Sequence, residues 1–184
     1  MNNMKIILLI ILILIIIKLI VGKTYFPIYL GIPIYPNNNK EVEIVKNYIK
    51  KRNEYDEKFF YKTNYSVVPA FIDIVDESPD VLYKIIDSIS NYELFFKYII
   101  NRARPYDIDL TIIPLSTKTS QTPAYPAGHA MQAYFLAKIL SKKYPNKKDM
   151  LYNIAYNCDL TRVKAGIHYP SDGNYSRFLV DTLF

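Results

Sequence analysis

The chain has 184 residues, of which 51% are hydrophobic, and this favours one folded domain with a buried core over a disordered chain. The formal net charge of +6 comes from basic residues spread along the sequence, which argues against a nucleic-acid-binding surface. The single cysteine, Cys158, excludes an intramolecular disulfide and a cysteine-based metal site, so we expect a buried, inert thiol.

The first predicted element is an apolar segment from Ile6 to Gly22, interrupted only by Lys18. It is long enough to cross a bilayer if the Lys18 ammonium reaches an interface. Small residues typical of a cleavage site are poorly represented at its end, which favours an anchor over a removed signal peptide. We therefore expect residues 1–24 to attach the protein to a membrane by a single pass, or to direct its secretion if they are cleaved.

The orientation of this span is left open by the positive-inside rule, because lysines lie on both sides of it. Its signal-like character favours a domain outside the cytoplasm. Residues 25–39 contain several prolines and end in consecutive asparagines, a composition typical of an extended linker. The folded domain is therefore predicted to comprise residues 40–184.

The first half of this domain is predicted to contain three helices. Apolar residues recur at helical spacing from residue 41 to 61, which predicts one amphipathic helix. Ser78 supplies an N-cap for a second helix that begins at Pro79 and ends near residue 89. A third helix, over residues 93–103, is expected to end before Pro105, because the residue ahead of a proline disfavours helical geometry.

The second half begins with a predicted surface loop over residues 107–125, which contains prolines and a centre rich in Ser, Thr and Gln. Helices are expected at residues 128–143, at residues 148–164, and finally after a cap at Ser171 or Asp172. No segment alternates as a strand would. The predicted fold class is all-α, a compact helical bundle that presents polar residues to one pocket.

Two clusters between Lys97 and His129 suit phosphate chemistry. Lys97 and Arg104 are seven residues apart, and two turns along one helix face would bring both cations to one anion. The segment 126–129, Pro-Ala-Gly-His, leads into a helix whose N-terminal N–H groups and dipole favour an anion. Gly128 allows the backbone to approach a ligand closely, and His129 follows it.

A third cluster places Arg162, His168 and Asp172 in order, and so offers a cation, a base and a carboxylate. Each cluster alone is a weak indication, because single histidines and exposed cations are usually structural or solubilising. Their combination and spacing from Lys97 to Asp172 are specific. The pattern resembles the superfamily of type 2 phosphatidic acid phosphatases, vanadium-dependent haloperoxidases and bacterial class A acid phosphatases, and is closest in style to the last.

The resemblance implies a phosphatase that needs no metal and forms a phosphohistidine. His168 would attack phosphorus, Asp172 would fix the tautomer of His168, and His129 would protonate the leaving oxygen. The phosphoryl oxygens would be held by the backbone N–H of Gly128 and by the side chains of Lys97, Arg104 and Arg162.

One residue departs from the family pattern. Ala127 stands where the family usually has serine, so one hydroxyl donor to phosphate is lost. A neutral hydrogen bond contributes about 0.5–1.5 kcal/mol net, so we expect reduced or retuned activity rather than none. Thr161 replaces a frequent serine before Arg162 and keeps the hydroxyl.

Two other functions stay open. The same residues would cradle vanadate in a haloperoxidase, although this chain has no room for the larger halide site of those enzymes. A membrane-tethered structural protein with a degraded site is the non-enzymatic alternative, and Ala127 is the only motif residue that suggests it.

The expected partner is a phosphorylated small molecule or a lipid phosphate. One convincing apolar span separates this chain from multi-span lipid phosphatases and favours soluble monoesters, although a lipid phosphate in the adjacent bilayer would also reach the pocket. No heptad seam or interface motif indicates an oligomeric state.

Overall fold

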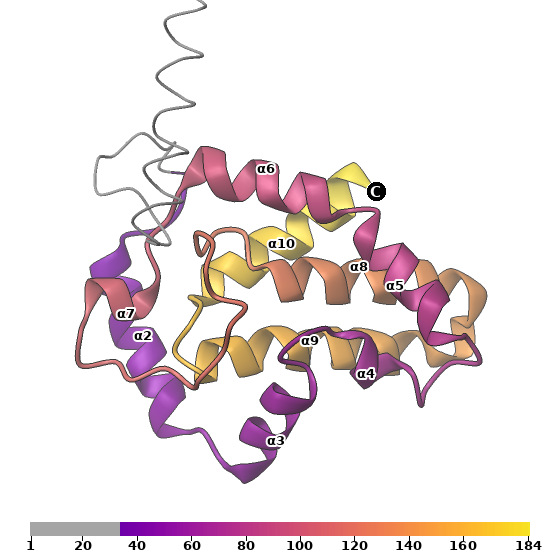
Figure 1. The fold of residues 1–184 in the computed structure, drawn as a ribbon, viewed down its shortest axis with the longest axis horizontal. Coiled ribbons are helices and arrows are strands. Elements are labelled where there is room, and N and C mark those ends of the chain that lie inside the picture. The colour runs from indigo at the N-terminus through magenta and orange to yellow at the C-terminus, as the bar shows by residue number, and fades with distance from the viewer. Residues whose placement is uncertain (1–33) are drawn as a thin grey trace, which may run out of the picture.

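The computed structural model describes residues 34–184, and every regular element in this range is a helix (Figure 1). The predicted all-α fold class is therefore confirmed. The predicted membrane span and most of the predicted linker lie outside the described residues. Between residues 34 and 184, no helix combines the length and the apolar character needed to cross a membrane.

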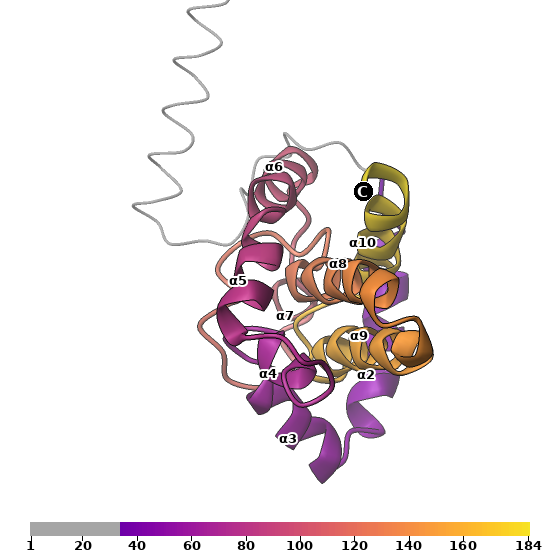
Figure 2. The same cartoon turned by 90° about the vertical axis from the view of Figure 1, so that its right-hand side faces the viewer.

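The helices follow one another along the chain as α2 (Asn38–Lys50), α3 (Glu54–Lys62), α4 (Val68–Phe71), α5 (Pro79–Asp87), α6 (Ser90–Ile100), α7 (Pro105–Ile108), α8 (Gly128–Lys143), α9 (Lys148–Lys164) and α10 (Pro170–Leu183). A short 3₁₀ helix, Pro145–Lys147, joins α8 to α9. Helices α8 and α9 lie side by side at the centre, and α10 packs against both (Figures 1 and 2). Helices α5 and α6 cover α8, while α2, α3 and α4 pack on α9.

Helix α8 forms the middle of the core because it is apolar around most of its circumference. Ala130, Ala133 and Ala137 are fully buried, and their small side chains let the neighbouring helices approach closely. Met131 and Leu136 fill the space between them. The helix therefore carries its N-terminal residues, which belong to the second sequence cluster, on a rigid central element.

The helix predicted over residues 41–61 is two helices, so that prediction was wrong. The Asn53 side chain accepts a hydrogen bond from the Asp56 N–H at 3.0 Å, and the Asp56 carboxylate accepts one from the Asn53 N–H at 3.0 Å. This reciprocal capping starts α3 after α2 has ended at Lys50. The local capping chemistry overrides the helical spacing of the apolar residues.

The helix predicted over residues 93–103 also ends early. Helix α6 stops at Ile100, because Asn101 adopts a left-handed conformation with φ of 51°. Arg104 is extended, as expected for a residue ahead of a proline, and α7 begins at Pro105. Lys97 and Arg104 therefore do not share a helix face, and the geometric argument made for them from sequence was wrong.

The loop predicted over residues 107–125 is only partly a surface loop. Its first residues belong to α7, and its last residues enter the interior, where Ser120, Ala124 and Tyr125 are buried. The Ala124 N–H donates to the Arg102 carbonyl at 2.8 Å. This contact holds the end of the loop beside the segment that follows α6.

The caps of two helices differ in detail from the prediction. Ser78 occupies the N-cap position of α5, but its side chain makes no capping hydrogen bond. Helix α10 starts at Pro170, ahead of both predicted caps, and Asp172 accepts a hydrogen bond from the Tyr169 N–H at 2.9 Å. Ser171 instead donates its hydroxyl hydrogen to the Glu41 carboxylate on α2. The first turn of α10 is thereby fixed in place.

Candidate active site

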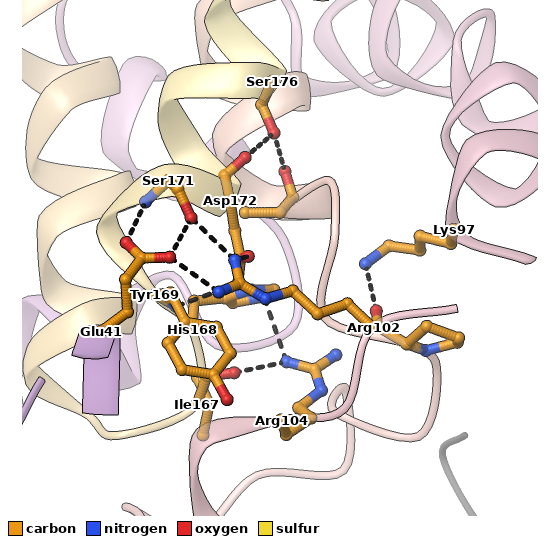
Figure 3. Close-up of polar contacts among 12 residues, drawn as sticks. Glu41, Lys97, Arg102, Arg104, Ile167, His168, Tyr169, Ser171, Asp172 and Ser176 are labelled. Atoms are coloured by element: carbon orange, nitrogen blue, oxygen red, sulfur yellow. Dashed lines mark hydrogen bonds and ion pairs between the residues drawn. The ribbon is translucent and has the colours of Figure 1, made fainter. Parts of the chain in front are cut away.

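The third sequence cluster forms where α9 ends and α10 begins. Gly166 makes the turn that ends α9, with φ of +77°, a conformation that residues with a Cβ rarely adopt. His168 follows this turn and is buried, with 3% of its surface exposed. Asp172 lies one helical turn later on α10 and is fully buried. The two side chains face each other (Figure 3).

The imidazole of His168 is held on both of its nitrogens. Nδ1 lies 2.8 Å from Asp172 Oδ2, and Nε2 lies 3.1 Å from an NH group of Arg104. A guanidinium only donates hydrogen bonds, so Nε2 accepts and carries a lone pair, while Nδ1 carries the proton that Asp172 accepts. Burial, and next Arg104, lower the pKa of His168 well below its usual value. The ring is therefore neutral, with its basic nitrogen on the side of the cations.

Asp172 accepts hydrogen bonds only, and this requires an ionised carboxylate. Arg102 donates to Oδ1 at 2.6 Å, while His168 and the Tyr169 N–H donate to Oδ2 at 2.8 and 2.9 Å. Burial raises the pKa of Asp172, and the Arg102 guanidinium is the strongest influence in the opposite direction. The charge of Asp172 thus depends on Arg102.

Arg102 is a buried residue of the candidate site that the sequence prediction missed. It is fully buried, pairs with Glu41 Oε2 at 2.7 Å as well as with Asp172, and lies over the Tyr169 ring at 3.7 Å (Figure 3). Its Nε also donates to Asn38 at 2.9 Å. In the sequence, Arg102 is visible only as a third cation close to Lys97 and Arg104. Its burial in the fold distinguishes it from a solvated surface arginine.

Lys97 and Arg104 are brought together by the buried end of the loop before α8. The Lys97 ammonium donates to the Pro123 carbonyl at 2.9 Å. Arg104 donates to the neighbouring Thr122 carbonyl at 3.1 and 2.9 Å, and to the Ile167 carbonyl at 2.8 Å. Two consecutive carbonyls therefore hold the two cations close together, as a shared helix face was expected to do. Both predicted cations converge on the segment that carries His168.

Arg162 lies fully buried in α9 and reaches the end of α3. Its guanidinium donates to the Phe60 carbonyl at 3.3 Å, to the Thr63 hydroxyl at 3.1 Å and to the Thr63 carbonyl. Its Nε is buried and has no hydrogen-bond partner among the described residues. Burial lowers the pKa of Arg162 to about 10, so it stays charged at neutral pH. Arg162 thus brings positive charge and an unsatisfied donor to the site.

His129 occupies the first turn of α8 and is only partly buried. Its Nε2 lies 3.0 Å from the Asn64 carbonyl, which can only accept, so Nε2 carries a proton. Burial, and next the positive charge of Arg162, lower the pKa of His129 well below its usual value. The second nitrogen, Nδ1, is then the position that gains or loses a proton.

Gly128 is closely packed against the Glu93 side chain at the start of α8. A Cβ at this position would lie 2.1 Å from Glu93 Oε1, and the Glu93 carboxylate is also held by Gln132 at 3.1 Å. Ala127 precedes it with a fully buried side chain. The Ala127 N–H donates to the Asp172 carbonyl at 3.2 Å, and its carbonyl accepts from the Ser176 hydroxyl at 2.9 Å. The second cluster is thereby packed directly on α10.

The seven predicted site residues therefore fall into one region, with the cations, both histidines and the carboxylate on different elements. Lys97 comes from α6, His129 from α8 and Arg162 from α9. Arg104 and His168 come from connecting segments. An anion held among three cations beside a basic imidazole nitrogen is what such a region can stabilise.

The fold is similar to that of a solved membrane enzyme. The structure described as the first transmembrane PAP2 type phosphatidylglycerolphosphate phosphatase from Bacillus subtilis matches with a TM-score of 0.53 and 22% sequence identity. The match covers 80% of this chain and 87% of that chain. At this identity the likeness shows a shared fold. No curated protein matches the chain by sequence.

The sequence itself matches the family model of the PAP2 superfamily over residues 81–179. This range contains every motif residue from Lys97 to Asp172 and exceeds half of the 184 residues. The resemblance inferred from the motifs is confirmed. The chain therefore belongs to the PAP2 superfamily.

Proposed function

We propose that this protein is a phosphatase that hydrolyses lipid phosphates or related monoesters through a phosphohistidine on His168. The observation that carries the proposal is the environment of His168: Asp172 takes the Nδ1 proton, and Nε2 faces Arg104 with a lone pair. A neutral imidazole held in this tautomer beside cations is an activated nucleophile for an anionic phosphoryl group.

In the first step, Nε2 of His168 forms a bond to phosphorus while the bond from phosphorus to the ester oxygen breaks. Arg104 turns its NH group from Nε2 to a phosphoryl oxygen, and Lys97 and the unpartnered Nε of Arg162 bind the others. The imidazolium of His129 gives its Nδ1 proton to the leaving oxygen. The products of this step are an alcohol and the phosphohistidine.

In the second step, a water molecule attacks phosphorus and the P–N bond to His168 breaks. Neutral His129 now takes the proton from the water, so that it returns to the imidazolium. Asp172 stabilises the positive charge that His168 carries while it is phosphorylated. The step releases inorganic phosphate and restores both histidines.

The substrate class is proposed from the family and from the sequence. Membership of the PAP2 superfamily, together with the likeness to a phosphatidylglycerolphosphate phosphatase, supports a lipid phosphate. The apolar run from Ile6 to Gly22 would hold the domain at a membrane where such a lipid resides. Soluble monoesters remain the alternative substrates.

The proposal is tested with the full-length protein in detergent micelles and in lipid vesicles. Phosphate release is measured from phosphatidylglycerol phosphate, phosphatidate and a soluble aryl phosphate, with EDTA present and His168→Ala as the control. Turnover that EDTA does not reduce and that the variant lacks is expected. Vanadate-dependent halide oxidation without phosphate release would instead identify a haloperoxidase, and no activity of either kind would indicate a degraded site.

A leaving-group dependence is expected for His129. Because burial lowers the pKa of His129, its imidazolium persists only at acidic pH, so kcat/KM for alkyl phosphates should fall as pH rises through that lowered pKa. His129→Ala should cost about 10²–10⁴-fold with alkyl phosphates and far less with aryl phosphates, which leave without protonation. The measurement is kcat/KM against pH for both ester types. Equal losses for both types would contradict the role of His129 as a proton donor.

A gain of activity is expected from Ala127→Ser. The new hydroxyl would lie at the N-terminus of α8 and restore a donor to the phosphoryl group. One neutral hydrogen bond of about 0.5–1.5 kcal/mol corresponds to a rise in kcat/KM of about 2–10-fold. Steady-state kinetics check this, and Ala130→Ser, one turn further along α8, is the matched control. A rise in both variants, or in neither, would show that residue 127 does not limit phosphate binding.

A further inference from the structure

Helix α6 differs from an ordinary surface helix, because its lysine is buried while most of its apolar residues are exposed. Lys97 is 2% exposed, whereas Phe95 is 59% exposed. The exposed positions of α6 are almost all apolar or aromatic, and comprise Asn91, Tyr92, Leu94, Phe95, Tyr98 and Ile99. An exposed apolar face of this kind on a helix is normally covered by protein or lipid.

Helix α10 extends this surface at the same end of the molecule (Figures 1 and 2). The rings of Tyr92 and Phe184 lie 5.3 Å apart, and those of Phe96 and Tyr175 lie 6.4 Å apart. Phe178 stacks on Tyr175 at 5.8 Å and is itself exposed. We call the exposed side chains of Tyr92, Leu94, Phe95, Tyr98, Ile99 and Phe178 the α6–α10 face.

The path of the chain brings this face close to the segment that precedes the domain, which carries the apolar run from Ile6 to Gly22. Tyr35, near the start of the described residues, lies 5.9 Å from the Tyr125 ring and 4.8 Å from the guanidinium of Arg102. Arg102 comes two residues after the end of α6 at Ile100. The chain therefore enters the domain beside the C-terminal end of α6.

The number of residues between the apolar run and Ile34 limits how far the domain can lie from that run. The apolar run ends at Gly22, 12 residues before Ile34. Those residues extend over at most about 43 Å. A bilayer that contains the apolar run is thus within reach of the α6–α10 face.

The composition of the face suits the membrane–water interface rather than a membrane-spanning helix. Helix α6 has 11 residues, too few to cross a bilayer. Its exposed aromatic rings suit the boundary between headgroups and acyl chains, and none of its exposed positions is acidic. We propose that the α6–α10 face lies in the surface of the lipid bilayer, with α6 parallel to the membrane plane.

The membrane contact stands apart from the proposed phosphatase activity. Its consequence for the choice of substrate rests on that activity. Lys97 leaves α6 on the side opposite to the exposed face and joins the cations around His168. With the face in the headgroup layer, the phosphate of a lipid in the same leaflet is about one helix diameter, roughly 10 Å, from Lys97. The enzyme would therefore favour a lipid phosphate within a bilayer over a soluble ester.

The absence of tryptophan from the sequence allows a direct test of the contact. Phe95→Trp and Tyr55→Trp each introduce a single reporter, and the two positions are almost equally exposed, at 59% and 61%. Tyr55 belongs to α3, at the opposite end of the molecule from α6 (Figures 1 and 2). Each full-length variant is placed in phosphatidylcholine–phosphatidylglycerol vesicles, with and without bromine on the acyl chains.

Bromolipid is expected to lower the emission of Phe95→Trp about twofold or more, because the indole would lie at the acyl-chain boundary, and to leave Tyr55→Trp unchanged. No quenching of Phe95→Trp, or equal quenching of both variants, would overturn the proposal. Blue-shifted emission of Phe95→Trp without quenching would also overturn it, since the face would then be covered by protein, either a second copy or residues 1–33.

A kinetic readout links the contact to the substrate. Phe95→Ser should lower turnover of phosphatidylglycerol phosphate in vesicles about fivefold or more, and leave hydrolysis of a soluble aryl phosphate unchanged. Equal losses on both substrates would show a structural defect and count against the proposal. If the wild type hydrolyses neither substrate, the proposed phosphatase fails, whereas the quenching result still decides the membrane contact by itself.

Discussion

His168→Ala is expected to lower phosphatase turnover by about four orders of magnitude or more and to abolish the phosphoenzyme. The reason is that no other described group presents an unprotonated nitrogen between a carboxylate and the cations. Loss of a nucleophile is among the most severe changes to an enzyme that works by covalent catalysis. Residual turnover would come from water acting in a site that still binds phosphate.

The measurement is quenching in alkaline denaturant after mixing with a ³²P-labelled substrate, followed by detection of protein-bound phosphate that is stable in base and lost in acid. His129→Ala is the matched control, because it alters the other histidine and should still accumulate phosphoenzyme from an aryl phosphate with a good leaving group. Circular dichroism confirms that both variants are folded. Equal labelling of the wild type and His168→Ala would refute His168 as the nucleophile.

The helices that sequence predicted best are those in which several local signals agree. Helices α8 and α9 have the bounds predicted for them, since helical spacing, the glycine at residue 128 and the proline at residue 145 all point to the same limits. The first predicted helix failed at Asn53, where a capping box interrupts an apolar pattern that continues across the break. Periodicity reports which face is buried, not whether the helix is continuous.

The identity of the site residues could be predicted, but the reason for their convergence could not. Lys97 and Arg104 meet because Asn101 ends α6 and the Thr122 and Pro123 carbonyls draw both cations to one place. A left-handed asparagine and a buried loop end depend on tertiary packing. Spacing along the chain carries no information about them.

Arg102 and Glu41 were missed for a related reason. Their ion pair joins residues that are 61 positions apart, and Glu41 lies at the start of the domain, far from every motif. A charged residue in a sequence is usually a solvated one. Burial of Arg102 against Tyr169, and its contact with Asp172, appear only once the fold is known.

Arg102→Gln is expected to lower kcat/KM by about 10–100-fold, the range found when a residue that orients a metal-binding histidine is lost, because Arg102 likewise holds the carboxylate that orients His168. Burial raises the pKa of Asp172, and the Arg102 guanidinium is the strongest influence that lowers it. Without the guanidinium, the pKa of Asp172 therefore rises further. The carboxylate must be ionised to accept the Nδ1 proton of His168. The acidic limb of kcat/KM should therefore move to higher pH, and activity should recover partly as the pH is raised.

The pH profile of kcat/KM for an aryl phosphate checks this, because such a substrate does not depend on protonation by His129. Arg52→Gln is the matched control, since Arg52 pairs with Glu57 at 3.0 Å on the periphery and should leave the profile unchanged. Glu41→Gln keeps Arg102 in place and should shift the acidic limb less. A lower melting temperature of Arg102→Gln with an unshifted profile would mean that Arg102 only stabilises the fold, because a buried ion pair that loses one partner costs about 3–5 kcal/mol whatever its role in catalysis.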